Sequence, residues 1–403
     1  MAEVTNYIDR LVAEFCPDGV EYRPLESLGK RNKGTAITAS KMRSLEPGNK
    51  DLRIFAAGST FVDTDSSNIP AKDILHGPAI IVKSRGYIGF EYYEKSFTHK
   101  NEMWSYTLDS NIVDQKFIYY YLLTQAYYLQ ELARSKSVKL PQLSVKDTDS
   151  LEVPVPPLEI QEAIVEILDK FTNLEAELEA ELEARILQYE YYRDSLFEAL
   201  DCPRVPLGSF AQYSKDRKKD DSTVSVYVGV ENLKSDFQGC TPTESTNPGV
   251  IFRKDDILLG NIRPYLKKMW RADSDGVASP DVLVIRIRDE FSEGISSRYL
   301  YHLLASNEFV GYNVAHSRGG KMPSGNEAKI LEFEAPIPSL EEQQRIVDIL
   351  DRFDALTSSL SEGLPAELAA RRSQYEYYRD QLLTFPRKGE NQQPTAHQTA
   401  HHA

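Results

Sequence analysis

Basic side chains interleaved with aromatic residues and glycines are the groups in this chain whose chemistry is easiest to specify. Such clusters suit a nucleic-acid surface, because lysine and arginine bind phosphates, while arginine and asparagine also pair with base edges in the major groove. An ordinary solvated surface explains any one of these residues equally well, so the hypothesis rests on clusters. The candidate DNA-binding residues are Lys33, Lys41, Arg43, Lys83, Arg85, Lys136, Lys139, Lys215, Arg217, Lys218, Lys219, Asn261, Arg263, Lys267, Arg318 and Lys321.

One basic loop occurs twice. Residues 135–141 (SKSVKLP) are echoed by residues 317–323 (SRGGKMP), 182 positions later. A loop that two otherwise different regions share suits backbone phosphates, which carry no sequence information, better than it suits bases.

The sequence has no recognisable catalytic motif. Residues 29–34 resemble the opening of a phosphate-binding loop, but Thr35 stands where that motif needs lysine. No dinucleotide fingerprint or metal-ligand spacing is present, and the three cysteines have no redox or metal spacing. Asp281 precedes a β-rich run, an arrangement that is typical of one corner of a metal-dependent nuclease site. Such a site also needs an acidic residue and a lysine two positions later in the following strand, and this triplet is missing. The sequence therefore favours a core strand with exposed Arg286 and Arg288. We therefore predict a non-catalytic binding protein without cofactor or metal residues.

The net charge of −14 is unevenly distributed. Residues 154–200 carry 3 basic and 12 acidic side chains, and residues 336–385 carry 5 and 9. Residues 1–153 carry 19 and 20, and residues 201–335 carry 18 and 19, so these two regions can present basic faces. The start of the chain lacks the features of a signal peptide, and no apolar run nears the ~20 residues of a membrane span, so we expect a cytoplasmic protein with no membrane contact.

The acidic regions contain a second repeat. The string QYEYYRD occupies 188–194 and returns at 374–380, and residues 155–171 are echoed by residues 337–353. Apolar residues at steps of three, four and seven predict one continuous helix in 154–200, which includes the tract LEAELEAELEAR at 174–185. The second copy has four extra residues around 363–365 (GLP), which predict an interruption. We expect the two helices to pack on each other.

These repeats predict an α+β fold with a pseudo-twofold internal repeat, in which two mixed α/β domains are joined by two long, antiparallel, packed helices. The expected parts are a first domain at 1–153, a helical spacer at 154–203, a second domain at 204–335, a second spacer at 336–385 and a disordered tail at 386–403. We expect strands at 79–83, 225–229, 256–260 and 282–286, and short aromatic helices at 117–123 and 299–305.

The QYEYYRD strings carry tyrosines on more than one face of a helix, so a single partner helix cannot cover all of them. Tyrosine is favoured at surfaces that are buried yet partly wet, which favours a protein interface over simple helix packing. The candidate partner-binding residues are Tyr189, Tyr191, Tyr192, Tyr375, Tyr377 and Tyr378.

In the order of its motifs, which is domain, helix, domain, helix, the chain resembles the specificity subunit of type I restriction–modification enzymes. The resemblance covers everything but the tail. It implies that each domain is a target-recognition domain that reads one half of a bipartite, asymmetric double-stranded DNA site. It also implies that the helices set the spacing and dock two modification subunits, with restriction subunits in the full complex. S-adenosylmethionine, Mg and ATP are then expected on the partner subunits.

Two alternatives stay open. One is a helical scaffold that joins two domains without affinity for DNA, and the other is a free-standing methyltransferase or nuclease. Salt-dependent duplex binding distinguishes the first from a specificity subunit, and methyl transfer by the chain alone would support the second.

Overall fold

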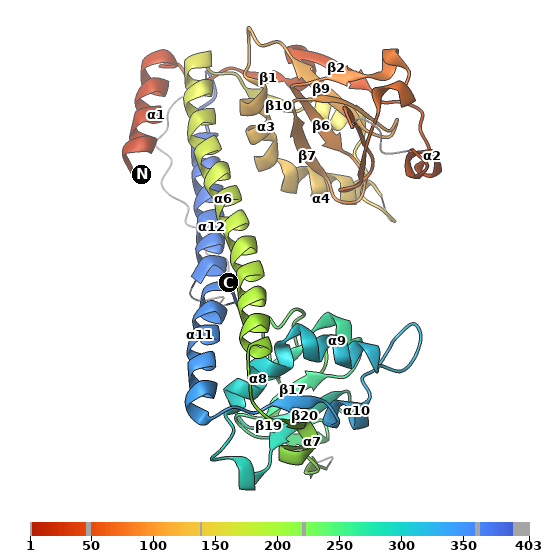
Figure 1. Cartoon of the computed structure of the whole chain (residues 1–403). Helices are drawn as coiled ribbons and strands as arrows, with labels where there is room; N and C mark the ends of the chain where they lie inside the picture. Colours follow the sequence, from red (N-terminus) through yellow and green to blue (C-terminus); the bar gives the residue numbers. More distant parts are fainter. Residues whose placement is uncertain (1, 46–49, 138, 220–222, 359–362, 390–403) are drawn as a thin grey trace. The chain divides into compact units, whose positions relative to one another are not determined.

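The computed structural model describes residues 2–45, 50–137, 139–219, 223–358 and 363–389. The chain divides into two compact units, which are Met1–Leu174 with Arg371–Ala403 (unit 1) and Glu175–Ala370 (unit 2). Each unit therefore contains one mixed domain, the beginning of one long helical segment and the end of the other (Figure 1).

The first long helix is α6 (Leu158–Glu198), which runs without a break through the LEAE tract. It begins directly after Pro156 and Pro157, as the sequence predicts. Its early apolar positions Ile160, Ile164 and Leu168 are completely buried in the core of unit 1.

The second helical segment is described as α11 (Leu340–Ser358) and α12 (Gly363–Leu382), and residues 359–362 between them lie outside the described residues. Gly363 has a φ of 79°, and a Cβ atom there would lie 2.6 Å from the carbonyl oxygen of Leu356. Pro365 falls in the first turn of α12, where a missing N–H costs no helical hydrogen bond.

The domain of unit 1 begins with a helix and is otherwise rich in short strands. Its elements are α1 (Ala2–Phe15), β1 (Tyr22–Pro24), η1 (Leu25–Leu28), β2 (Gly29–Lys33), α2 (Ala39–Arg43), β3 (Leu52–Phe55), β4 (Phe61–Thr64), η2 (Ser66–Asn68), η3 (Ala71–Asp73), β5 (Leu75–His76), β6 (Ala79–Lys83), β7 (Gly89–Tyr93), β8 (Ser96–His99), β9 (Trp104–Leu108), α3 (Gln115–Thr124), α4 (Ala126–Lys136), α5 (Val145–Asp149) and β10 (Glu152–Pro154).

The domain of unit 2 has a corresponding set. Its elements are β11 (Arg204–Pro206), α7 (Leu207–Phe210), β12 (Ala211–Tyr213), β13 (Arg217–Lys218), β14 (Ser225–Val228), β15 (Thr243–Ser245), β16 (Gly249–Phe252), β17 (Ile257–Gly260), η4 (Pro264–Leu266), β18 (Met269–Arg271), β19 (Gly276–Ala278), β20 (Val282–Ile287), η5 (Asp289–Phe291), α8 (Ser297–Ala305), α9 (Asn307–Ala315), α10 (Glu327–Leu331) and β21 (Glu334–Pro336).

Apart from the additional edge strand β13 of unit 2, the two domains share one sheet topology despite their different sequences. Each has an antiparallel four-stranded sheet, in the order β2-β9-β6-β7 or β12-β20-β17-β18, and a two-stranded ribbon, β1-β10 or β11-β21. Each also has a second sheet, β4-β3-β8-β5 or β13-β16-β19-β14-β15, which contains one parallel pair. In unit 1, α3 and α4 pack against strands of the first sheet (Figure 1). The four strands and two aromatic helices expected from the sequence are all present.

Each domain is held to the beginning of its long helix by a buried glutamine. Gln161 and Gln343 are 182 positions apart, and neither is accessible to solvent. The side-chain oxygen of Gln161 accepts a hydrogen bond from the N–H of Asp114 at 2.8 Å, and that of Gln343 from the N–H of Ser296 at 2.9 Å. Each side-chain amide also donates to two backbone carbonyl groups, so both ends of the side chain fix the helix to its domain.

The prediction of a disordered tail from residue 386 is wrong for its first residues. The N–H of Val20 donates to the carbonyl of Pro386 at 2.8 Å, and the N–H of Lys388 donates back to Val20 at 3.0 Å. Arg387 forms an ion pair with Glu152 at 2.6 Å. Residues 390–403 lie outside the described residues. No helix among the described residues is both long enough and apolar enough to cross a membrane.

Candidate nucleic-acid interface

The loops that follow two equivalent strands form the centre of the candidate interface in each domain. Residues 84–88 connect β6 to β7 in unit 1, and residues 261–268 connect β17 to β18 in unit 2. Both strand pairs occupy the same positions in matching sheets. The first loop carries exposed Arg85, and the second carries exposed Arg263.

The duplicated basic loop is hydrogen-bonded to this strand-end loop in both domains. In unit 1, the N–H of Gly86 donates to Pro141 at 2.9 Å, and the N–H of Leu143 donates to Ser84 at 3.0 Å. The basic loop starts later than expected, because Ser135 and Lys136 still belong to α4.

Unit 2 repeats this arrangement. The N–H of Arg263 donates to Pro323 at 2.7 Å, and the N–H of Gly325 donates to Asn261 at 2.9 Å. Pro323 and Gly325 lie 182 positions after Pro141 and Leu143. The structure therefore brings together two basic segments that the sequence shows only separately.

Within unit 1, the candidate cations of this cluster differ in their availability. Arg85 and Lys139 are exposed, and the Arg85 guanidinium donates to the side-chain oxygen of Gln142 at 3.2 Å. Lys83 is ion-paired with Glu91 at 2.7 Å, and Lys136 is ion-paired with Asp147. Those two lysines carry charge that the domain already compensates, which weakens their candidacy.

In unit 2, Arg263, Arg318 and Lys321 are exposed, while the remaining two candidates face the protein. Lys267 lies 3.5 Å from the carboxylate of Glu190 on α6. The side-chain oxygen of Asn261 is buried without a hydrogen-bond partner, and a Cβ atom at Gly325 would lie 2.7 Å from it. We therefore do not retain Asn261 as a base-reading residue.

A further basic group lies in each domain, beside β2 of the first sheet and α2 in unit 1 and along the second sheet in unit 2. Lys33 ends β2, and Lys41 and Arg43 are exposed on the short helix α2, whose Met42 packs into a core with Leu52 of β3.

In unit 2, Arg217 and Lys218 form the edge strand β13, and Lys215 and Lys219 flank it. Lys218 donates to the hydroxyl of Ser225 at 3.1 Å, whereas the other three are exposed.

The six candidate tyrosines divide into buried and exposed positions. Tyr189 packs against the core of unit 2 and lies 3.3 Å from His302, and Tyr375 packs against the core of unit 1. By contrast, Tyr191 is 68% exposed and Tyr377 is 59% exposed. The remaining two, Tyr192 and Tyr378, each contact the exposed tyrosine edge to face. Each unit thus presents one exposed tyrosine, Tyr191 or Tyr377, in contact with a less exposed one, Tyr192 or Tyr378.

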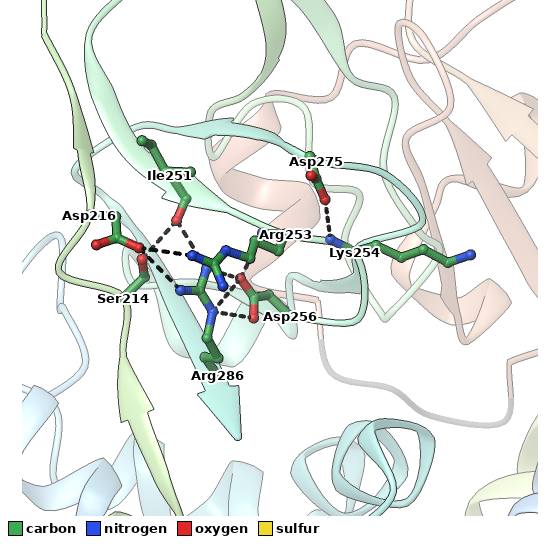
Figure 2. A network of polar contacts seen from close by, with 8 residues as sticks. All are labelled: Ser214, Asp216, Ile251, Arg253, Lys254, Asp256, Asp275 and Arg286. Atoms are coloured by element: carbon green, nitrogen blue, oxygen red, sulfur yellow. Dashed lines mark hydrogen bonds and ion pairs between the residues drawn. The ribbon is translucent and has the colours of Figure 1, made fainter. Parts of the chain in front are cut away.

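Two acidic residues of unit 2, Asp256 and Asp216, are both engaged by Arg286. Arg286 donates to both carboxylate oxygens of Asp256, with Nη2 at 2.7 Å from Oδ2, and it also lies 3.4 Å from Asp216 (Figure 2). The hydrogen bond to Asp256 raises the pKa of Arg286 above its ordinary value. Arg286 is largely buried, and Arg288, which donates to the carbonyl of Gly208 at 3.0 Å, is only partly exposed, so the prediction of exposed arginines is wrong for both.

No group of three or more histidine, cysteine, aspartate and glutamate side chains among the described residues could hold a metal ion.

Sequence comparison relates nearly the whole chain to one family. The family described as "Type I restriction modification DNA specificity domain" matches residues 17–188 and 209–370. A type I restriction enzyme specificity subunit from Escherichia coli is 31% identical over 413 residues, covering 95% of this chain and 98% of that protein. A putative type I restriction enzyme specificity subunit from Haemophilus influenzae is 29% identical over 68% of this chain and 73% of that protein.

Two solved structures share the fold. One is the type I restriction–modification system S subunit from M. genitalium, with a TM-score of 0.54 and 17% identity over 91% of this chain and 96% of that one. The other comes from a study of the assembly and conformational transition of the type I restriction–modification system. Its TM-score is 0.58 and its identity 13%, over 91% of this chain and 97% of that one.

Proposed function

Because this chain belongs to the family of type I restriction–modification specificity subunits and has its DNA sequence-specificity role, we propose that its two domains read the two halves of one bipartite, asymmetric DNA site. The observation that supports this most directly is the shared topology with diverged loops. Two copies of one framework place a strand-end loop and a basic loop at the same position, and the residues in the strand-end loops differ. Different loops on one framework suit different half-sites.

In this proposal, contacts to DNA divide between the two loops. The duplicated loops, with Lys139 in unit 1 and Lys321 in unit 2, bind backbone phosphates and set the register of each domain. The strand-end loops, with Arg85 and Arg263, face base edges, where a guanidinium group can pair bidentately with guanine.

We propose further that the helical segments set the distance between half-sites and that the QYEYYRD ends dock two modification subunits. The paired exposure of Tyr191 and Tyr377 supports two equivalent docks. Tyrosine is enriched at such interfaces because its ring is apolar and its hydroxyl tolerates water.

The chain itself is proposed to be non-catalytic. S-adenosylmethionine, Mg and ATP would be held by the modification and restriction subunits, and the whole complex would act on DNA in the cytoplasm. This division of labour is supported by a sequence without nucleotide-binding or metal-ligand motifs.

The decisive experiment is single-molecule methylome sequencing of a host with and without this chain. We expect one bipartite methylated motif to disappear when the chain is removed. The purified chain with its modification subunit should then bind a duplex of that motif more tightly than a scrambled duplex, with an affinity that falls steeply with salt.

If no methylated motif disappears when the chain is removed, the proposal is refuted. Absence of salt-dependent duplex binding would favour the scaffold alternative, and methyl transfer by the chain alone would favour a free-standing enzyme.

A further inference from the structure

One tyrosine in each strand-end loop projects from its domain. Tyr87 is 77% exposed and Tyr265 is 50% exposed, whereas other tyrosines of the two domains, such as Tyr106 and Tyr299, are buried. Tyr87 follows Gly86, and Tyr265 lies two positions after Arg263, so each follows the residue that is hydrogen-bonded to the basic loop. The match holds although the surrounding sequences differ.

The backbone on both sides of Tyr87 is fixed by a single side chain of α4. The side-chain oxygen of Gln130 accepts a hydrogen bond from the N–H of Ile88 at 2.8 Å, and its amide donates to the carbonyl of Gly86 at 3.2 Å. A methyl group of Leu140, in the basic loop, lies close to Gly86, because a Cβ atom at Gly86 would be 3.8 Å from it. The exposed ring therefore projects from a rigid turn.

Tyr265 is fixed by different means. It lies in η4, between Arg263 and Lys267, whose φ angles of 54° and 52° place both in the left-handed region. The N–H of Asp236 donates to the carbonyl of Leu266 at 3.0 Å, which ties this turn to a neighbouring loop. Left-handed residues that are not glycine cost about 1 kcal/mol or more and persist where the surroundings impose them, often at binding sites.

An exposed aromatic ring on a rigid turn beside arginine has a specific use at a DNA surface. The ring has no charge with which to bind phosphate, but its face can stack on any base, because every base has a π face. Holding the ring in place beforehand lowers the entropy cost of that contact. A base contact that tolerates any sequence explains why both domains keep the tyrosine while their other loop residues differ.

We propose that Tyr87 and Tyr265 each stack on a base of their own half-site at a step where the duplex is unstacked. The proposal rests on the proposed function and adds a contact that both half-sites share. Enzymes that modify a base must extrude it from the stack, so an aromatic residue that stabilises an unstacked step also helps the modification.

The test uses the complex of the full chain with its modification subunit and a duplex of the mapped motif. Single 2-aminopurine substitutions in one half-site at a time report unstacking by their fluorescence. Tyr87→Ala should weaken binding about 10-fold and abolish the fluorescence increase in the first half-site only, and Tyr265→Ala should do so in the second only. Tyr87→Phe should stay within about twofold of the wild type, because the ring face is retained.

Tyr128→Ala is the matched control. Tyr128 is 57% exposed on the same domain, but it lies two positions from Gln130 on α4 and therefore does not share its face. We expect wild-type binding and fluorescence from this variant.

Unchanged binding and fluorescence in Tyr87→Ala and Tyr265→Ala would overturn the proposal and leave the proposed function standing, since the wild-type complex binds its motif in the same titration. An equal loss for Tyr128→Ala would also overturn it. If the wild-type complex itself shows no preference for the motif, the proposed function fails and the stacking proposal fails with it.

Discussion

The ring of Phe171 stacks on the ring of Tyr378, with centroids 5.8 Å apart and planes 22° apart. In unit 2, Phe353 and Tyr192 form the equivalent pair, with centroids 5.6 Å apart and planes 28° apart. Each unit therefore joins the beginning of one long helical segment to the end of the other through the same pair of residue types. This tyrosine of each QYEYYRD string packs inside its unit, whereas the neighbouring Tyr191 and Tyr377 are exposed, and these two are the residues of the proposed docks.

The double variant Tyr191→Ala/Tyr377→Ala should weaken association with the modification subunit by about 10- to 100-fold, because truncating a tyrosine hot spot costs about 2 kcal/mol or more. The free energy of unfolding of the double variant should differ from that of the wild-type chain by no more than about 0.5 kcal/mol, since both side chains are exposed. Light scattering after size-exclusion chromatography measures the stoichiometry, and calorimetric titration measures the affinity. Tyr7→Ala, which removes a 48% exposed tyrosine from α1, is the control, and equal losses in both variants would contradict a dock at QYEYYRD.

His99 should make the stability of unit 1 depend on pH. This side chain is inaccessible to solvent, and burial lowers its pKa to about 4, so the folded chain keeps it neutral while the unfolded chain protonates it near pH 6.5. Because the unfolded state binds the proton more readily, stability falls as pH falls from about 6.5 toward 4, by at most about 3 kcal/mol.

Urea unfolding at pH 7 and pH 5, followed by the fluorescence of Trp104 in a Trp270→Phe background, measures this effect. His99→Gln should flatten the pH dependence, whereas Tyr7→Ala, which retains His99, should keep it. A His99→Gln variant with the full wild-type slope would assign the slope to other groups.

Asp256 should be essential for the stability of unit 2. Its carboxylate is 5% exposed and neutralises the largely buried Arg286, so Asp256→Asn leaves that guanidinium with only the more exposed Asp216 as a charged partner and should cost about 3 kcal/mol. Asp255→Asn is the adjacent control, because Asp255 is 49% exposed in its ion pair with Arg271, and asparagine accepts its left-handed φ of 73°. That variant should lose no more than about 1 kcal/mol. Scanning calorimetry distinguishes the two, and similar small losses would show that the Arg286 pair contributes little.

The sequence predicts most of the framework because its signals are local or repeated. The apolar stripe of 164–171, the β-rich run at 79–83 and the 182-residue offset each identify an element without knowledge of the fold. The importance of Gln161 and Gln343 could also have been predicted, since both end the repeated Pro-x-Leu-Glu-x-Gln pattern. Their hydrogen bonds to the domains could not have been predicted, because the backbone groups of Asp114 and Ser296 are distant in sequence.

The candidate site was less predictable because its contacts join distant residues. Arg85 and Gln142 pair across 57 positions, and no local pattern signals that pairing. Lys136 and Asp147 compensate each other across a turn, so basic composition alone overstated the charge available to DNA. The inward direction of Asn261 follows from the close approach of Gly325, which only the fold reveals.

The LEAE tract should determine the spacing between half-sites in whole repeats. Deleting residues 178–181 joins Glu177 to Leu182, which keeps the leucine repeat in register and shortens α6 by about 6 Å. Four residues turn a helix by about 400°, so the remaining side chains rotate by only about 40° and the packed face is retained. DNA rises about 3.4 Å per base pair, so the spacer of the methylated motif should become one or two base pairs shorter while both half-sites stay the same.

Deleting only residues 178–179 is the matched contrast. Two residues turn the helix by about 200°, which moves the half-buried stripe that includes Leu182 to the opposite face. That variant should lose methylation altogether, because the end of α6 no longer packs against its unit. Methylome sequencing of cells carrying each deletion gives both results, and an unchanged spacer in the four-residue deletion would refute the role of α6 in measuring the site.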